Sequence, residues 1–225
     1  MSSPTTSGTT SITTTRWAPV IAAGAFTVLA VAGNALQGST PALHGDAEAV
    51  VRFYSAAPER IAVAMMLSLL SLFALASLLA VLVRTVEAAQ PRDVAASRMT
   101  SIGGSATVAL LAGGFALNSA GALRAGNAAP LAPESAVVFY DGGLALSGLA
   151  APLGMAVLLA GTALSVFRTA VLPRWFGWTS AGLAVVGLVT PVSFVLALVF
   201  PLWALAAGAV LVRRPVPADE DDLRR

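Results

Sequence analysis

The stretch IAVAMMLSLLSLFALASLLAVLV, residues 61–83, decides the fold class of this chain. Its 23 residues carry no charge, and as an α-helix rising about 1.5 Å per residue they would extend roughly 34 Å. The hydrocarbon core of a bilayer is about 30 Å thick. The polar side chains in the stretch, Ser68, Ser71 and Ser77, can bond back to their own helix. The stretch therefore predicts a membrane-spanning helix.

The composition of the whole chain agrees with this interpretation. Of its 225 residues, 57% are hydrophobic and only 11% are charged, whereas soluble domains carry about 25% charge. So few charges cannot cover a water-facing surface. The formal net charge is +2, and every positive side chain is an arginine, so no strongly basic surface predicts a nucleic-acid partner. The absence of cysteine and the single His44 exclude thiolate and histidine-rich metal sites, and no cofactor is predicted.

Similar uncharged stretches recur along the chain and predict an all-α, polytopic bundle of six transmembrane helices. The predicted spans cover about residues 17–36, 61–83, 99–123, 142–167, 175–190 and 193–212. They form one domain, residues 16–213, between a Ser/Thr-rich N-terminal tail, residues 1–15, and an acidic C-terminal tail, residues 214–225. Both tails lack apolar periodicity and are predicted to be disordered. Glycines in the third span, including Gly103 and Gly114, predict that it is the closely packed centre of the bundle.

Three features leave alternatives open. Residues 178–212 form either two short helices turning at Thr190-Pro191-Val192 or one long kinked helix. The first span is either retained or removed as a signal peptide, because Ala30-Val31-Ala32 fits the small-x-small cleavage pattern. Pro152 in the fourth span is expected to kink that helix.

The arginines predict the orientation in the membrane. With six spans, ten arginines fall on one side and three, Arg52, Arg60 and Arg124, on the other. Cytoplasmic loops carry the excess of positive charge. Both termini are therefore predicted to be cytoplasmic.

The two predicted outer loops resemble each other. The segment from Glu48 to Tyr54 reads EAVVRFY, and the segment from Glu134 to Tyr140 reads ESAVVFY, with shared positions offset by 86. These are the only two tyrosines, and each follows a phenylalanine. We interpret the pattern as a duplicated helix–outer loop–helix hairpin. Such repeats occur in transporters and also arise by plain duplication of a stable hairpin.

Five polar residues near the outer ends of the spans form the candidate site. They are Asn34, Gln37, Tyr54, Asn118 and Tyr140. An unpaired amide in hydrocarbon is costly, so these residues either line an outer-face pocket, with the tyrosines as a lid, or bond to neighbouring helices as structural links. The tyrosines are alternatively interfacial anchors.

No pattern predicts catalysis. His44, Asp46 and Glu48 stand in one outer loop, but their spacing matches no defined metal-ligand set, and Asp46 is also placed to cap a short amphipathic helix. Hydrolase, zinc-protease and phosphate-loop motifs are missing. The chain is therefore predicted not to be an enzyme, and no catalytic, cofactor-binding or metal-binding residues are assigned.

Two motifs carry a resemblance to a broader group. The sequence LPRWFGW at residues 172–178 opens a span, and an outer loop of the type Ala-Glu-x-Val-x-x-Phe-Tyr occupies residues 47–54. Over roughly residues 17–214 the chain resembles a group of small, actinobacterial-type multi-pass membrane proteins of unknown function. The resemblance implies a six-helix protein of the bacterial inner membrane and brings no activity.

These features favour a non-catalytic scaffold or accessory subunit with the lipid bilayer and a protein of a membrane complex as partners. A lipid or small hydrophobic molecule is the expected ligand of the outer-face pocket. The alternatives are a small-molecule or lipid transporter and, after that, an intramembrane enzyme acting on lipid.

Overall fold

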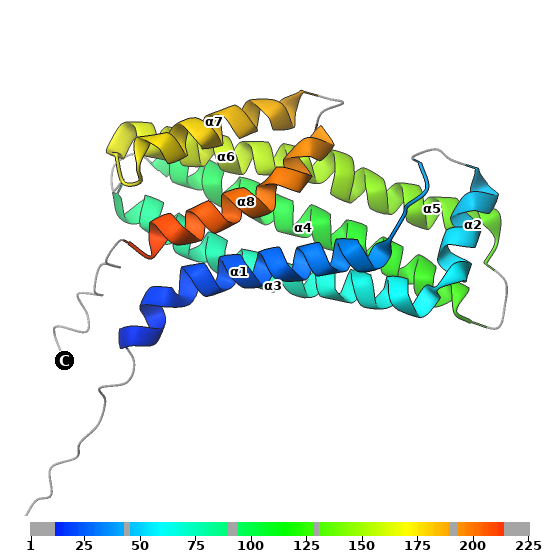
Figure 1. Ribbon diagram of the computed structural model, residues 1–225. Helices are drawn as coiled ribbons and strands as arrows, with labels where there is room; N and C mark the ends of the chain where they lie inside the picture. The colour runs from blue at the N-terminus through cyan, green and yellow to red at the C-terminus, as the bar shows by residue number, and fades with distance from the viewer. Residues whose placement is uncertain (1–11, 43–45, 90–93, 128–130, 190–192, 214–225) are drawn as a thin grey trace, which may run out of the picture.

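The computed structural model describes residues 12–42, 46–89, 94–127, 131–189 and 193–213, and within these ranges the regular structure is entirely helical (Figure 1). Three long helices are α1 (Ile12–Gln37), α3 (Pro58–Ala89) and α4 (Val94–Ala125). A fourth is continuous through α5 (Pro133–Leu144), η1 (Ala145–Ala150) and α6 (Ala151–Thr169). The shorter helices are α2 (Ala47–Ala56), α7 (Arg174–Leu188) and α8 (Ser193–Leu211). The predicted all-α class is confirmed.

Four of the described helices are long and apolar enough to cross a membrane: residues 16–37, 58–89, 94–125 and 133–169. This composition fits the predicted membrane protein. Helix α7 has 15 residues, or roughly 22 Å of length, which is short for a bilayer core. The fifth and sixth predicted spans are thus helical, at α7 and α8, but do not reach the length of the other four.

The long helices extend beyond the apolar stretches that predicted them. The predicted N-terminal tail overlaps α1, which begins at Ile12, and the predicted C-terminal tail lies outside the described residues. The largest difference is at the fourth span, which begins at Pro133 instead of residue 142. Pro133 fits the first turn of a helix, and the acidic Glu134 follows it there. The segment expected in an outer loop is therefore the first part of the long helix.

Pro152 does not break this helix. The six residues before α6, Ala145–Ala150, form a π-helical turn, and Pro152 follows at the start of α6. A proline lacks a backbone N–H and crowds the preceding turn, and a wider turn is one way in which a helix accommodates it.

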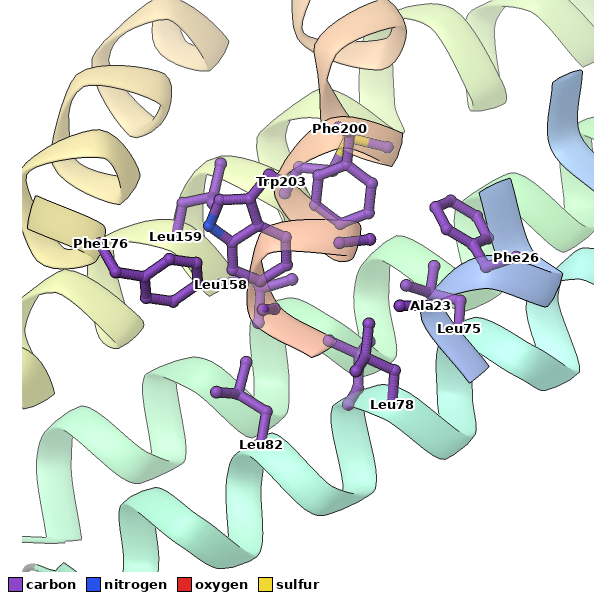
Figure 2. Packing of buried hydrophobic residues seen from close by; sticks show 14 of the residues in the cluster. Ala23, Phe26, Leu75, Leu78, Leu82, Leu158, Leu159, Phe176, Phe200 and Trp203 are labelled. Carbon is purple, nitrogen blue, oxygen red and sulfur yellow. The ribbon is translucent and has the colours of Figure 1, made fainter. Parts of the chain in front are cut away.

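The helices pack in neighbouring pairs around a common core (Figure 1). Helix α1 lies along α3, α4 lies along both α3 and α6, and α7 lies along α6. Helix α8 crosses the bundle and contacts α1 and α7. Its Trp203 and Phe200 stack at 5.2 Å between ring centroids, and Phe176 of α7 stacks on Trp203 at 5.6 Å (Figure 2).

The contact between α7 and α8 decides between two sequence interpretations. The indole Nε1–H of Trp203 donates a hydrogen bond of 3.0 Å to the hydroxyl of Ser180, and both residues are buried. Residues 178–212 therefore fold as two helices that meet, and the single long kinked helix is wrong. The turn predicted at residues 190–192 lies outside the described residues.

Glycine and small residues bring α4 and α6 close together. A Cβ atom on Gly103 would lie 2.8 Å from the Cα of Leu158, and one on Gly161 would lie 2.6 Å from the backbone nitrogen of Thr100. The predicted close packing of α4 is thus present. However, the helix with the larger buried share is the one from Pro133 to Thr169, because α6 is contacted by α4 on one side and α7 on another.

The two ends of the bundle carry different charges. Helix α2 and the start of α5 lie at one end of the bundle (Figure 1). The connection between α6 and α7 lies at the other end, together with the first residues of α1 and the last residues of α8. Among described residues, the first end holds Asp46, Glu48, Arg52, Glu59, Arg60, Arg124, Glu134 and Asp141, and we call it the acidic end. The second holds Arg16, Arg84, Glu87, Arg98, Arg168, Arg174 and Arg213, and we call it the basic end.

Candidate functional site

The candidate site lies at the acidic end, where α2 meets α4 and α5. Asp46 begins α2 as predicted, because its carboxylate accepts a hydrogen bond of 3.2 Å from the backbone N–H of Glu48. On α2, Val50 and Tyr54 are one turn apart and both are buried. The opposite face carries Glu48 and Arg52, an exposed ion pair at 3.5 Å. The amphipathic pattern of this helix therefore directs Tyr54 into the bundle.

Tyr54 and Asn118 are joined across 64 residues of sequence. The Tyr54 hydroxyl donates a hydrogen bond of 2.9 Å to Oδ1 of Asn118. The Nδ2 of Asn118 in turn donates to the carbonyl oxygen of Gly114 at 3.1 Å, within α4. Both side chains are buried, Tyr54 completely. The amide thus has a partner at each of its two polar atoms, which satisfies the requirement for a buried polar group.

Gly121 provides the space for the Tyr54 ring. A Cβ atom at this position would lie 2.6 Å from Cζ of Tyr54 and 2.9 Å from its hydroxyl oxygen. Any larger residue would displace the ring and with it the bond to Asn118. Gly121 lies three residues after Asn118, on the same face of α4.

The second tyrosine completes an aromatic cluster. Tyr140 of α5 packs edge-on against Phe53 and Tyr54, with centroid distances of 5.8 Å and 6.4 Å. This is a favourable arrangement for aromatic pairs. The Tyr140 hydroxyl donates to the carbonyl oxygen of Pro41, between α1 and α2. The two similar segments found in the sequence therefore pack against each other, and their tyrosines are inside the protein.

Burial also affects the acidity of Tyr54. Loss of water around the phenol raises its pKa well above the usual value, and the neighbouring Tyr140 and the carboxylate of Asp141 raise it further. The phenol is therefore neutral and donates its proton in the bond to Asn118 over the whole physiological range.

The structure brings together three of the five predicted residues. Tyr54, Asn118 and Tyr140 form the cluster, which we call the Tyr–Asn cluster together with Phe53. Asn34 is exposed on α1 and bonds to its own helix, from Nδ2 to the carbonyl oxygen of Ala30 at 3.3 Å. Gln37 is half-buried at the last position of α1. The clustered residues fill the space between their helices, so the structural-link interpretation describes them better than a lid over a pocket.

The described residues hold no group of three or more His, Cys, Asp or Glu side chains that could bind a metal ion. Of His44, Asp46 and Glu48, which the sequence places in one loop, His44 lies outside the described residues. The carboxylate of Asp46 is occupied as the cap of α2.

Sequence reasoning missed two open spaces on the sides of the bundle. One, of about 700 Å³, lies between α1 and α3 and includes Trp17, Ala22 and Ala74. The other, of about 570 Å³, lies between α3 and α4 and includes Arg84, Ser105 and Ala109. A signal for the second was present in the sequence: small residues recur at intervals of four in both helices, at Ala76 and Ala80 and at Ser101, Ser105 and Ala109.

Comparison of the chain with protein-family models, curated proteins and solved structures gave no match. The likeness to actinobacterial-type membrane proteins therefore stays a prediction, and the function has to be argued from the site itself.

Proposed function

We propose that this chain is a non-catalytic integral membrane protein that acts as a scaffold or accessory subunit of a membrane complex. The observation that carries the proposal is the hydrogen-bonded link from Tyr54 through Asn118 to Gly114. Its polar atoms are used to fasten α2 to α4, and the aromatic rings fasten α2 to α5. Helix α2 is thereby held in place on the bundle with its charged face exposed, and such a face can bind another protein.

The proposed topology has six spans, with α7 and α8 as the last two, and both termini in the cytoplasm of a bacterial cell. It is supported by the separation of the two ends, since α2 lies opposite the connection between α6 and α7. Topology reporters fused after residue 127 and after residue 171 test it. The first position should report outside and the second inside, and the reverse result would refute the orientation.

The duplicated hairpin is part of this proposal. Helix α1 lies along α3 in the first half, and α4 lies along α6 in the second. Adding the offset of 86 to α2 (Ala47–Ala56) gives residues 133–142, which fall within α5 (Pro133–Leu144). We infer that the two halves arose by duplication and that α2 corresponds to α5, which in the second half is the first part of the fourth long helix.

Purification of the full chain in mild detergent tests the scaffold function. We expect a stoichiometric protein partner, identified by mass spectrometry. Asn118→Ala should release it, because α2 loses its link to α4. Ser119→Ala is the matched control, since within the described part of the chain that hydroxyl bonds to the carbonyl oxygen of Phe115 in its own helix, at 2.8 Å, and to no other helix. A lone parent chain, or equal retention by both variants, would refute the proposal.

A transporter is the second candidate, and the π-helical turn before Pro152 favours it. Such turns are often found at functional sites, and interrupted helices line the binding sites of many transporters. Purified protein in liposomes should then move a solute from a panel of small molecules and lipids, whereas empty liposomes should not. Equal traces for both would reject transport.

A further inference from the structure

The groove between α3 and α4 at the basic end is lined in turn by charged, hydroxyl and apolar side chains along its length. It measures about 570 Å³. Its walls include Ala76 and Ala80 on α3 and Ala109 on α4. These side chains are too small to bridge the two helices, so the space between them stays open to the surrounding membrane.

Charged groups lie where the groove opens at the basic end of the bundle. Arg84 lines it directly, one turn beyond Ala80 on the same helix. Arg98 of α4 is exposed and shares a helical stripe with Ser101, Ser105 and Ala109, because positions three, seven and eleven residues apart lie within about 60° of one another. Arg84 thus lies in the wall of the groove, and Arg98 lies at the same end of α4, one turn before Ser101.

Two hydroxyl groups follow one and two turns further inward. Ser101 and Ser105 line the groove. Within the described part of the chain their hydroxyls have no hydrogen-bond partner, whereas the neighbouring Thr100 and Thr107 bond to carbonyls of their own helix at 3.0 Å and 2.8 Å. Unpaired hydroxyls next to hydrocarbon are costly. An acceptor from the bound molecule would remove this cost.

We propose that the groove binds a glycerophospholipid. Its phosphate contacts Arg84 and Arg98, its ester carbonyls accept hydrogen bonds from Ser101 and Ser105, and one acyl chain lies between α3 and α4 along Ala109. The order from guanidinium to hydroxyl to apolar wall spans roughly 17 Å along α4 and matches the order of groups in such a lipid. Arginine suits this role because its fork of donors fits phosphate oxygens.

Glu87 gives the site a preference for the headgroup. It lines the same groove, about one turn further out than Arg84. A carboxylate beyond the phosphate accepts hydrogen bonds from an ethanolamine ammonium or a glycerol hydroxyl. A choline headgroup has no N–H or O–H to donate and should bind less tightly.

Native mass spectrometry of the delipidated full chain, titrated with phosphatidylethanolamine, tests the site. Arg84→Gln with Arg98→Gln should raise the Kd at least about tenfold, the size expected from losing one charge-assisted hydrogen bond. Arg174→Gln with Arg213→Gln removes the same charge from the same end and should leave the Kd within about twofold of the parent. Equal weakening by both pairs would show general electrostatic attraction and overturn the proposal.

A second pair of variants tests the groove without changing charge. Ala109→Leu places a larger side chain in the acyl-chain path and should also raise the Kd. Ala35→Leu, at an exposed position of α1, is the matched control and should not. Circular dichroism and gel filtration confirm that each variant folds. If Ala109→Leu binds like the parent, or if diacylglycerol without phosphate binds equally well, the proposal is overturned.

The rival occupant is a second copy of the chain. Because the sequence contains no cysteine, Ala109→Cys introduces a single reactive thiol at the groove. Efficient disulfide-linked dimers in native membranes would show that another protein helix fills the groove and would overturn the lipid site. Monomers that bind phosphatidylethanolamine more tightly than phosphatidylcholine, with the difference reduced by Glu87→Gln, would support it.

Discussion

Replacing Gly103 with alanine tests the close crossing of α4 and α6. The added Cβ atom would lie 2.8 Å from both the Cα of Leu158 and the carbonyl carbon of Val157, and still closer to the backbone nitrogen of Leu158. All three are backbone atoms of α6, so no side-chain rotation relieves the overlap. The two helices have to separate along their interface.

The size of the effect follows from two opposing terms. Inserting a methyl group into a well-packed interior typically costs about 1–3 kcal/mol, and the rigid backbone at Leu158 favours the upper end, about 3 kcal/mol. Alanine also stabilises a helix by about 1 kcal/mol relative to glycine. We therefore expect Gly103→Ala to lower the free energy of unfolding by about 2 kcal/mol.

Two glycines provide controls in which only the second term acts. No atom lies within 4 Å of a Cβ added at Gly24 or at Gly182. Gly24→Ala and Gly182→Ala should therefore leave stability unchanged or raise it by about 0.5–1 kcal/mol. Thermal unfolding in detergent, followed by circular dichroism, compares the three variants. If Gly103→Ala is as stable as Gly24→Ala, the close α4–α6 approach is refuted.

Three further predictions concern the buried hydrogen bonds. Tyr54→Phe should lower the free energy of unfolding by about 1–3 kcal/mol, because Oδ1 of buried Asn118 loses its donor, and Ser119→Ala, measured by the same thermal unfolding, should not. The pKa of Tyr54 is higher in the folded chain than in the unfolded chain. The stability that Tyr54 confers is therefore complete below a pH of about 10 and falls as the pH rises further. Tyr54→Phe should remove that part of the alkaline loss of stability, and a variant whose stability depends on pH as the parent's does would contradict the prediction. Trp203→Phe should cost about 1–3 kcal/mol through the bond to Ser180, whereas Trp178→Phe, at a side chain 70% exposed, should leave the melting temperature nearly unchanged.

The sequence predicts the long apolar helices because their information is local. The uncharged residues 61–83 alone require a length that only a membrane helix fits, and α3 contains all of them. The predicted start of the fourth long helix, residue 142, was wrong, also because of local sequence features. Asp141, Gly142 and Gly143 follow the segment from Glu134 to Tyr140, and a charge beside two glycines predicts an interruption before the uncharged run that starts at Gly142. Gly143 stays helical because α4 packs against it, with the carbonyl oxygen of Gly114 only 2.9 Å from an added Cβ.

The candidate site was predicted in part. The two Phe-Tyr pairs identify Tyr54 and Tyr140 as related, and the cost of an amide in hydrocarbon marks Asn118. Which of these side chains bond to one another depends on how α2 folds back onto α4, and a separation of 64 residues leaves no local signal for that. Asn34 has the same chemistry as Asn118 but lies on the exposed side of α1, a difference set by helix rotation.

The two ends of the bundle differ in packing as well as in charge. At the acidic end, Tyr54 and Tyr140 fill the space between α2, α4 and α5.

Toward the basic end, the two described cavities lie on either side of α3, one beside Ala74 and Ser77 and the other beside Ala76 and Ala80. Four small side chains within seven positions make this part of α3 narrow, which leaves open space between it and α1 on one side and between it and α4 on the other. In water such gaps would be costly, but in a membrane acyl chains can fill them. Aromatic side chains thus fill the space between the helices at the acidic end, whereas the lipid groove proposed above lies beside the small side chains of α3.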